Sequence, residues 1–118
     1  KNVWQHMVGV ICLNLTNRKQ VKQVLPKLFE KYPNPTKFLI GNIKTQKSML
    51  APLGMISVRL KRLRKMSRDF IKWNYKDATD LHGIGKYGSD SYRIFYKNEI
   101  PENVQDKELK RYLNDKGI

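Results

Sequence analysis

Apolar residues recur at steps of three and four through most of this chain, and no stretch of useful length alternates between apolar and polar residues. The first pattern is that of an amphipathic α-helix, and the second is that of a half-buried strand. We therefore predict an all-α fold, a compact bundle of short helices. The length of 118 residues suits one domain over residues 1–118. Because the first residue is Lys1, we expect a piece of a longer protein.

Proline, glycine and capping residues divide the chain into short helical segments. The predicted helices are residues 3–13, a segment that begins after residue 16 or 17, and residues 36–40, 43–51, 57–74, 77–81, 86–97 and 106–114. Ser57 is the predicted N-cap of the longest helix. Pro26 lies inside the second apolar stripe and is predicted to kink that helix.

The charge balance limits the possible partners. Lysine and arginine number 24 against 10 aspartate and glutamate residues, which gives a formal net charge of +14. Such a balance is typical of nucleic-acid-binding domains, although an anionic membrane surface is a second possible polyanion. The single cysteine, Cys12, excludes an internal disulfide and the common cysteine-rich metal sites. His6 and His82 have no ligand partner at useful spacing, so we expect no metal and read all three side chains as structural.

Residues 81–88, with the sequence L-H-G-I-G-K-Y-G, have the form of a helix–hairpin–helix. Glycine allows backbone angles that a Cβ resists, and it lets the turn approach a nucleic-acid backbone closely. The N–H groups that begin the next helix are suited to binding a phosphate. The predicted DNA-binding residues are Gly83, Ile84, Gly85, Lys86 and Gly88. The structural alternative is an ordinary glycine-capped turn between two helices.

Asp106 follows Gly85 by 21 positions, with a predicted loop at residues 98–101 between them. This spacing resembles that of the helix–hairpin–helix superfamily of base-excision DNA glycosylases, which place an essential aspartate there. The run L-H-G-I-G-K-Y-G-S-D-S-Y-R-I-F at 81–95 is similar to that of the methyl-CpG-binding-domain thymine DNA glycosylases. So are K-Y-P at 31–33, P-L-G at 52–54 and L-N-x-T at 13–16. The resemblance covers nearly the whole chain.

The resemblance implies a DNA glycosylase of base excision repair that removes thymine or uracil mispaired with guanine. Asp106 would be the catalytic carboxylate, which stabilises positive charge on the sugar, or it is only the N-cap of the last helix. Asp90, the other acid of this region, is read as solvated or structural. Members of the superfamily that also cut the DNA strand carry a lysine at the position of Tyr87. The resemblance therefore implies a monofunctional enzyme, which removes the base and leaves the strand intact, with Tyr87 in the base pocket.

Leu15 and Met55 stand where the family places the side chains that fill the gap left by an extruded base. Plain packing is the alternative for both, and Leu15 departs from the arginine expected of mammalian relatives. In the basic helix at 57–74, the residues Arg59, Arg62 and Lys65 are candidates to face DNA.

The implied partner is double-stranded DNA with a mismatched or deaminated base, without a membrane or a small-molecule cofactor. A nuclear location and a monomer are expected. A non-catalytic helix–hairpin–helix DNA-binding module is the functional alternative, because the hairpin and the positive charge would satisfy it without chemistry.

Overall fold

The computed structural model describes residues 2–13, 18–97, 99 and 109. Their elements, in chain order, are α1 (Val3–Leu13), α2 (Arg18–Lys31), α3 (Pro35–Ile40), α4 (Ile43–Leu50), η1 (Ala51–Leu53), α5 (Ile56–Lys72), η2 (Ala78–Asp80) and α6 (Lys86–Tyr96), where η marks a 3-10 helix. These residues contain helices and no strand, which confirms the all-α prediction for this part of the chain. None of these helices combines the length and the apolar character that crossing a membrane requires.

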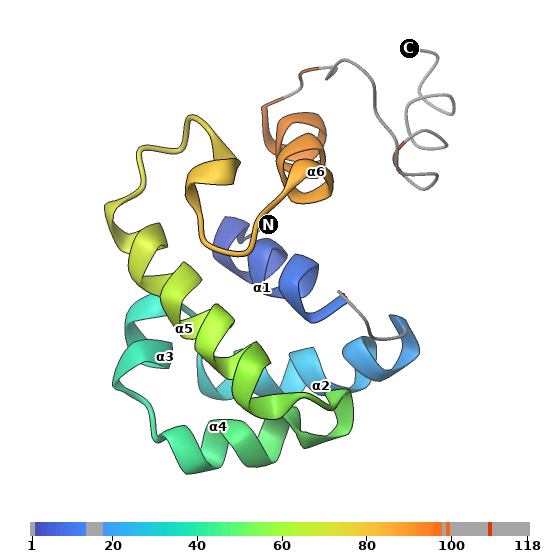
Figure 1. Cartoon of the computed structure of the whole chain (residues 1–118), viewed down its shortest axis with the longest axis vertical. Helices are drawn as coiled ribbons and strands as arrows, with labels where there is room; N and C mark the ends of the chain where they lie inside the picture. The colour runs from blue at the N-terminus through green and yellow to red at the C-terminus, as the bar shows by residue number, and fades with distance from the viewer. Residues whose placement is uncertain (1, 14–17, 98, 100–108, 110–118) are drawn as a thin grey trace.

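Helix α5 runs through the middle of the molecule (Figure 1). Helices α1, α3 and α4 pack against it, and α6 packs against α1 and η2. The inward face of α5 carries an apolar stripe at helical spacing, which consists of Leu60, Leu63, Met66 and Phe70. The core therefore forms around α5, and α1 lies between α5 and α6.

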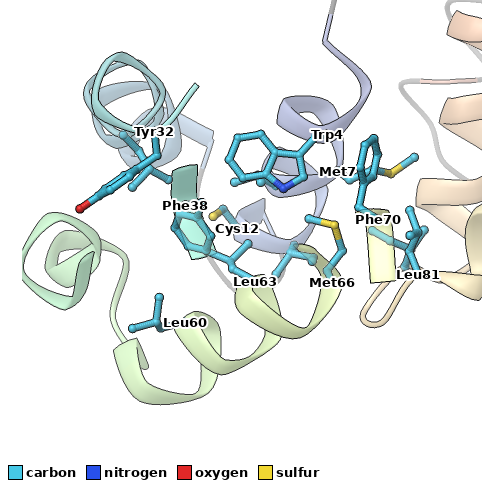
Figure 2. Packing of buried hydrophobic residues seen from close by; sticks show 14 of the residues in the cluster. Trp4, Met7, Cys12, Tyr32, Phe38, Leu60, Leu63, Met66, Phe70 and Leu81 are labelled. Carbon is cyan, nitrogen blue, oxygen red and sulfur yellow. The ribbon is translucent and has the colours of Figure 1, made fainter. Parts of the chain in front are cut away.

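Trp4 of α1 lies at the centre of this core. Its ring is 5.8 Å from the ring of Phe38, measured between centroids, and it lies with Leu63 and Met66 of α5 in one buried cluster (Figure 2). The indole N–H donates a 2.9 Å hydrogen bond to Ser67 Oγ, so the tryptophan meets its polar requirement inside the core. Every buried side-chain nitrogen or oxygen in the described ranges has a hydrogen-bond partner. The core fixes α1 against α5.

Short polar side chains begin three of the small elements. Asn34 accepts a 2.9 Å hydrogen bond from the Lys37 amide at the start of α3, and Asn42 accepts one of 3.0 Å from Thr45 in α4. Asp77 caps η2 by accepting from the Thr79 amide at 3.0 Å. Each cap satisfies an amide that has no partner within its helix. These caps explain why helices this short begin where they do.

The predicted helix bounds need several corrections. Ser57 is not the N-cap of α5, because the helix begins at Ile56 after Met55, whose backbone is left-handed. Helix α4 ends one residue early and is followed by η1, and η2 replaces the longer helix predicted at 77–81. Pro26 lies inside α2 as expected, and the kink there stays a prediction. Leu109, the one described residue of the predicted last helix, is helical and 2% exposed.

Candidate nucleic-acid interface

A glycine turn joins η2 to α6. Gly83 adopts a φ of 83°, in the left-handed region that side chains disfavour. The amide of Ile84 closes the turn by donating to the carbonyl of Leu81 at 3.1 Å. The side chain of Ile84 is 5% exposed, so this predicted DNA-binding residue contributes its side chain to the core and anchors the turn. The buried Ile84 side chain thus anchors the turn, and Gly83 and Gly85 lie on its exposed side.

Gly85 is the N-cap residue of α6, and it has no side chain to cap the first turn of that helix. A Cβ added at Gly85 would meet no atom within 4 Å, because the space outside it is open. Gly88, one turn further, is buried, and a Cβ there would lie 2.7 Å from Ile84 Cγ2 and 3.1 Å from Val10 Cγ1. The two glycines therefore differ in what they do. Gly85 keeps the surface open, whereas Gly88 lets α6 approach α1.

A cleft of about 550 Å³ lies beside this turn. Its walls come from the second half of α1, the first residue of α2, the middle of α5 and the start of α6. The described residues that line it are Val10, Ile11, Leu13, Arg18, Arg62, Gly83, Gly85, Lys86, Tyr87 and Gly88. The cleft brings together four of the five predicted DNA-binding residues and the predicted pocket residue Tyr87.

The cleft is positively charged. Arg18, Arg62 and Lys86 line it, and no carboxylate stands among its described lining residues. Lys86 Nζ lies 3.0 Å from Asp90 Oδ2, but Asp90 is 5% exposed and is not itself part of the lining. Cations gathered in a concave surface attract and hold anions. Arg18 is the residue here that sequence reasoning missed, since nothing near it in the sequence signals that it faces the glycine turn.

Tyr87 stands in the first turn of α6, half-buried at the wall of the cleft. Its ring packs beside a small buried cluster formed by Ile94 and Leu109. Asp106, the predicted catalytic residue, lies outside the described residues, and Leu109 follows it by three positions. Leu109, three positions after Asp106 in the sequence, therefore packs against α6 next to Tyr87.

No protein-family model matches this chain, whereas several curated proteins are similar to it, including the following two. One is the "Methyl-CpG-binding domain protein 4-like protein" of Arabidopsis thaliana, 28% identical over 92 residues, which cover 78% of this chain and 21% of the relative. The other is the "Thymine/uracil-DNA glycosylase" of Pyrobaculum aerophilum, 26% identical over 117 residues, which cover 93% of this chain and 50% of the relative. Both similarities support a DNA-glycosylase-related family at low identity.

The chain spans about a fifth of the length of the first relative and half of the second. The similarity to the glycosylase extends over most of this chain, with identical residues at about a quarter of the aligned positions.

Met55 lies on a second exposed turn, between η1 and α5. Gly54 and Met55 both have positive φ values, 73° and 47°, and Met55 is in the left-handed conformation. The Met55 side chain is 56% exposed although it is large and apolar. Residues held in an unfavourable backbone conformation cluster at functional sites, so this turn stays a candidate for DNA contact. Leu15, the other predicted wedge, lies outside the described residues.

Of the three basic residues named on α5, Arg62 lines the cleft and Lys65 is exposed. Arg59 is 4% exposed and bonds backbone carbonyls, so its inclusion among residues that could face DNA was wrong. Asp90 is ion-paired and buried, as a structural acid would be, and is not solvated.

His6 and Cys12 make structural contacts, and His82 makes one through its backbone amide. His6 Nε2 lies 2.9 Å from Ser91 Oγ and holds α1 against α6, and the amide of His82 donates to Asp69 Oδ2 at 2.9 Å. Burial raises the pKa of the Cys12 thiol to about 12, although the nearby Arg59 lowers it in part. In the described ranges, no three histidine, cysteine or acidic side chains gather as metal ligands would.

Proposed function

We propose that this chain is a monofunctional DNA glycosylase that removes thymine or uracil opposite guanine, and that the cleft between α1 and α6 receives the extruded base. The observation that carries this proposal is the cleft, where Tyr87 and three cations stand around an open glycine turn. The name of the Pyrobaculum aerophilum relative, a thymine/uracil-DNA glycosylase, supports the substrate class.

The roles follow from the chemistry of N-glycosidic bond cleavage. The Asp106 carboxylate stabilises the positive charge that develops on the sugar and helps water attack. Its spacing of 21 positions after Gly85, which resembles that of the glycosylase superfamily, supports this role. With tyrosine in place of an amine nucleophile at position 87, the DNA strand stays intact and an abasic site remains.

DNA binding would use two regions of the surface. The glycine turn and the cations Arg18, Arg62 and Lys86 contact phosphates around the extruded nucleotide, and such contacts carry no sequence information. Met55, with Leu15 as the second candidate, fills the space in the base stack. A nuclear location and a monomeric state stay predictions.

A single-turnover assay on labelled duplexes tests this proposal. The duplexes carry T or U opposite G, T opposite A, or C opposite G. The reaction products are analysed both before and after treatment with hot alkali. We expect strand breaks only on T and U opposite G, and only after alkali. Breaks without alkali would reveal a lyase. Tight binding without base release from any duplex would favour the non-catalytic DNA-binding module.

The variant Asp106→Asn isolates the catalytic carboxylate. We expect base release to slow by at least about a hundredfold, the usual contribution of such a group, while the duplex Kd changes less than about threefold. Asp80→Asn is the matched control, because it makes the same charge change at an exposed acid in η2. An Asp106→Asn variant as active as the control would remove this residue from the mechanism.

A further inference from the structure

Arg59 is a buried arginine on α5 whose guanidinium bonds two backbone carbonyls from distant segments. Its side chain is 4% exposed. Nε donates to the carbonyl of Gly54 at 2.9 Å, and Nη1 donates to the carbonyl of Cys12 at 2.8 Å. In the part of the chain that the structure describes, no carboxylate forms an ion pair with it. Its charge is therefore satisfied by main-chain oxygens.

Both carbonyls belong to segments that need an anchor. Cys12 lies in the last turn of α1, where carbonyls lack partners within the helix and carry the negative end of its dipole. Gly54 precedes Met55 in the left-handed turn before α5. A left-handed backbone is unfavourable for methionine, so surrounding contacts must hold it. Arg59 supplies such a contact from the first turn of α5, which begins directly after Met55.

We propose that Arg59 is a positioning residue that clamps the Gly54–Met55 turn to the end of α1, and so fixes where the Met55 side chain stands relative to the cleft. The same end of α1 supplies Ile11 and Leu13 to the cleft wall. One guanidinium thus joins the turn that bears the exposed methionine to a helix that lines the cleft. This inference rests on the proposed function, in which Met55 enters the base stack.

Arg64 provides a matched control on the same helix. Its guanidinium also bonds main-chain oxygens at the end of another helix, since Nη2 donates to the carbonyl of Leu39 at 2.8 Å and Nη1 to that of Phe38 at 3.3 Å. Those carbonyls belong to α3, however, and not to the Met55 turn. Replacing Arg64 removes the same kind of contact without touching the clamp.

The first measurement is amide hydrogen exchange in the chain without DNA. The Gly54 amide reports on the turn, because it donates to the carbonyl of Ala51 at 3.1 Å. We expect Arg59→Met to speed its exchange by about tenfold or more, the effect of losing charge-assisted hydrogen bonds. Arg64→Met should leave it within about twofold. If Arg59→Met fails to fold, Arg59→Lys keeps the cation without the planar fork and should change exchange in the same direction by less.

The second measurement is the single-turnover rate of base release in a double-mutant cycle with Met55→Ala. We expect Arg59→Met to slow release by about tenfold alone, and to have little further effect when Met55 is already alanine. Equal losses in both backgrounds, or equal changes in Gly54 exchange for Arg59→Met and Arg64→Met, would make Arg59 merely structural. If the unmodified chain releases no base, the proposed function fails, whereas the exchange measurement still decides whether the clamp exists.

Discussion

Cys12 is the one thiol of the chain, and it lies fully buried on the face of α1 toward the core. Burial removes water that would solvate a thiolate, so the pKa rises from 9.0 to about 12. The folded chain therefore keeps a proton that the unfolded chain loses above pH 9. Folding stability from this group is complete below pH 9 and is lost as the pH rises toward 12.

Urea unfolding at several pH values tests this linkage. We expect the unmodified chain to lose stability relative to Cys12→Ala by about 1.4 kcal/mol per pH unit between pH 9 and 12. The alanine variant carries a constant packing cost and so serves as the reference for other titrating groups. Parallel stability curves for the two proteins would show that the thiol ionises as easily when folded as when unfolded.

Arg59 illustrates what the sequence cannot reveal about a single residue. It stands in a run of basic residues, which indicates a solvated or DNA-facing side chain. Its two acceptors lie 5 and 47 positions away in the chain. A backbone carbonyl has no residue-type signature, so no sequence pattern could identify these partners. Cys12 was predictable as a buried thiol because the burial preference of cysteine is intrinsic.

For the individual helices, signals from neighbouring residues in the sequence determine most of the boundaries. The bounds predicted for α1 agree with the structure, because its apolar face and the polar residues after it are both local signals. The start of α5 was mispredicted because a serine was favoured as N-cap, whereas the N-cap is the left-handed Met55 and the helix begins at Ile56. We propose above that Arg59 holds this turn through its bonds to Gly54 and, 47 positions away, to Cys12.

Alanine substitutions at the two glycines of the turn before α6 should separate effects on folding from effects on DNA binding. Gly83→Ala should lower the free energy of unfolding by roughly 1–2 kcal/mol, because φ is positive there and Ile11 Cδ1 would lie 3.3 Å from the new Cβ. Gly85→Ala should cost less than about 1 kcal/mol, since its surroundings are open.

The binding result should differ between these two glycine variants. Gly85→Ala should weaken duplex binding by about tenfold, because a methyl group would separate the turn from a phosphate and cost a charge-assisted hydrogen bond. Thermal unfolding and duplex titration of both variants would check this. Unchanged affinity in Gly85→Ala would exclude close approach of a phosphate backbone at this residue.

For the whole molecule, the net charge of +14 indicates a polyanion partner but not where it binds. The sequence placed Tyr87 and the glycines together because they are neighbours in the chain. Arg18 and Arg62 join them only through the packing of α1, α2 and α5, which no local pattern records. The site was therefore predictable where it is local and not where it is assembled from distant helices.

The salt dependence of duplex binding tests which cations face the partner. Arg62→Gln should reduce the slope of log Kd against log salt concentration by about 0.9, the value for one phosphate contact. Lys61→Gln is the matched control, because this adjacent residue lines a separate hollow with Ile43 and Arg64. Equal slopes for the two variants would mean that the cleft does not contact phosphates through Arg62.

The packing of α1 has a consequence for biosynthesis. This helix carries no lysine, arginine or acidic residue, and it is translated before all the other helices described. Part of its burial comes from α5 and α6, which emerge from the ribosome later. Only α2 among the packing partners of α1 follows it directly in the chain. We expect the nascent chain to carry an incompletely covered apolar helix until α5 and α6 have emerged, and to be prone to aggregation during that interval.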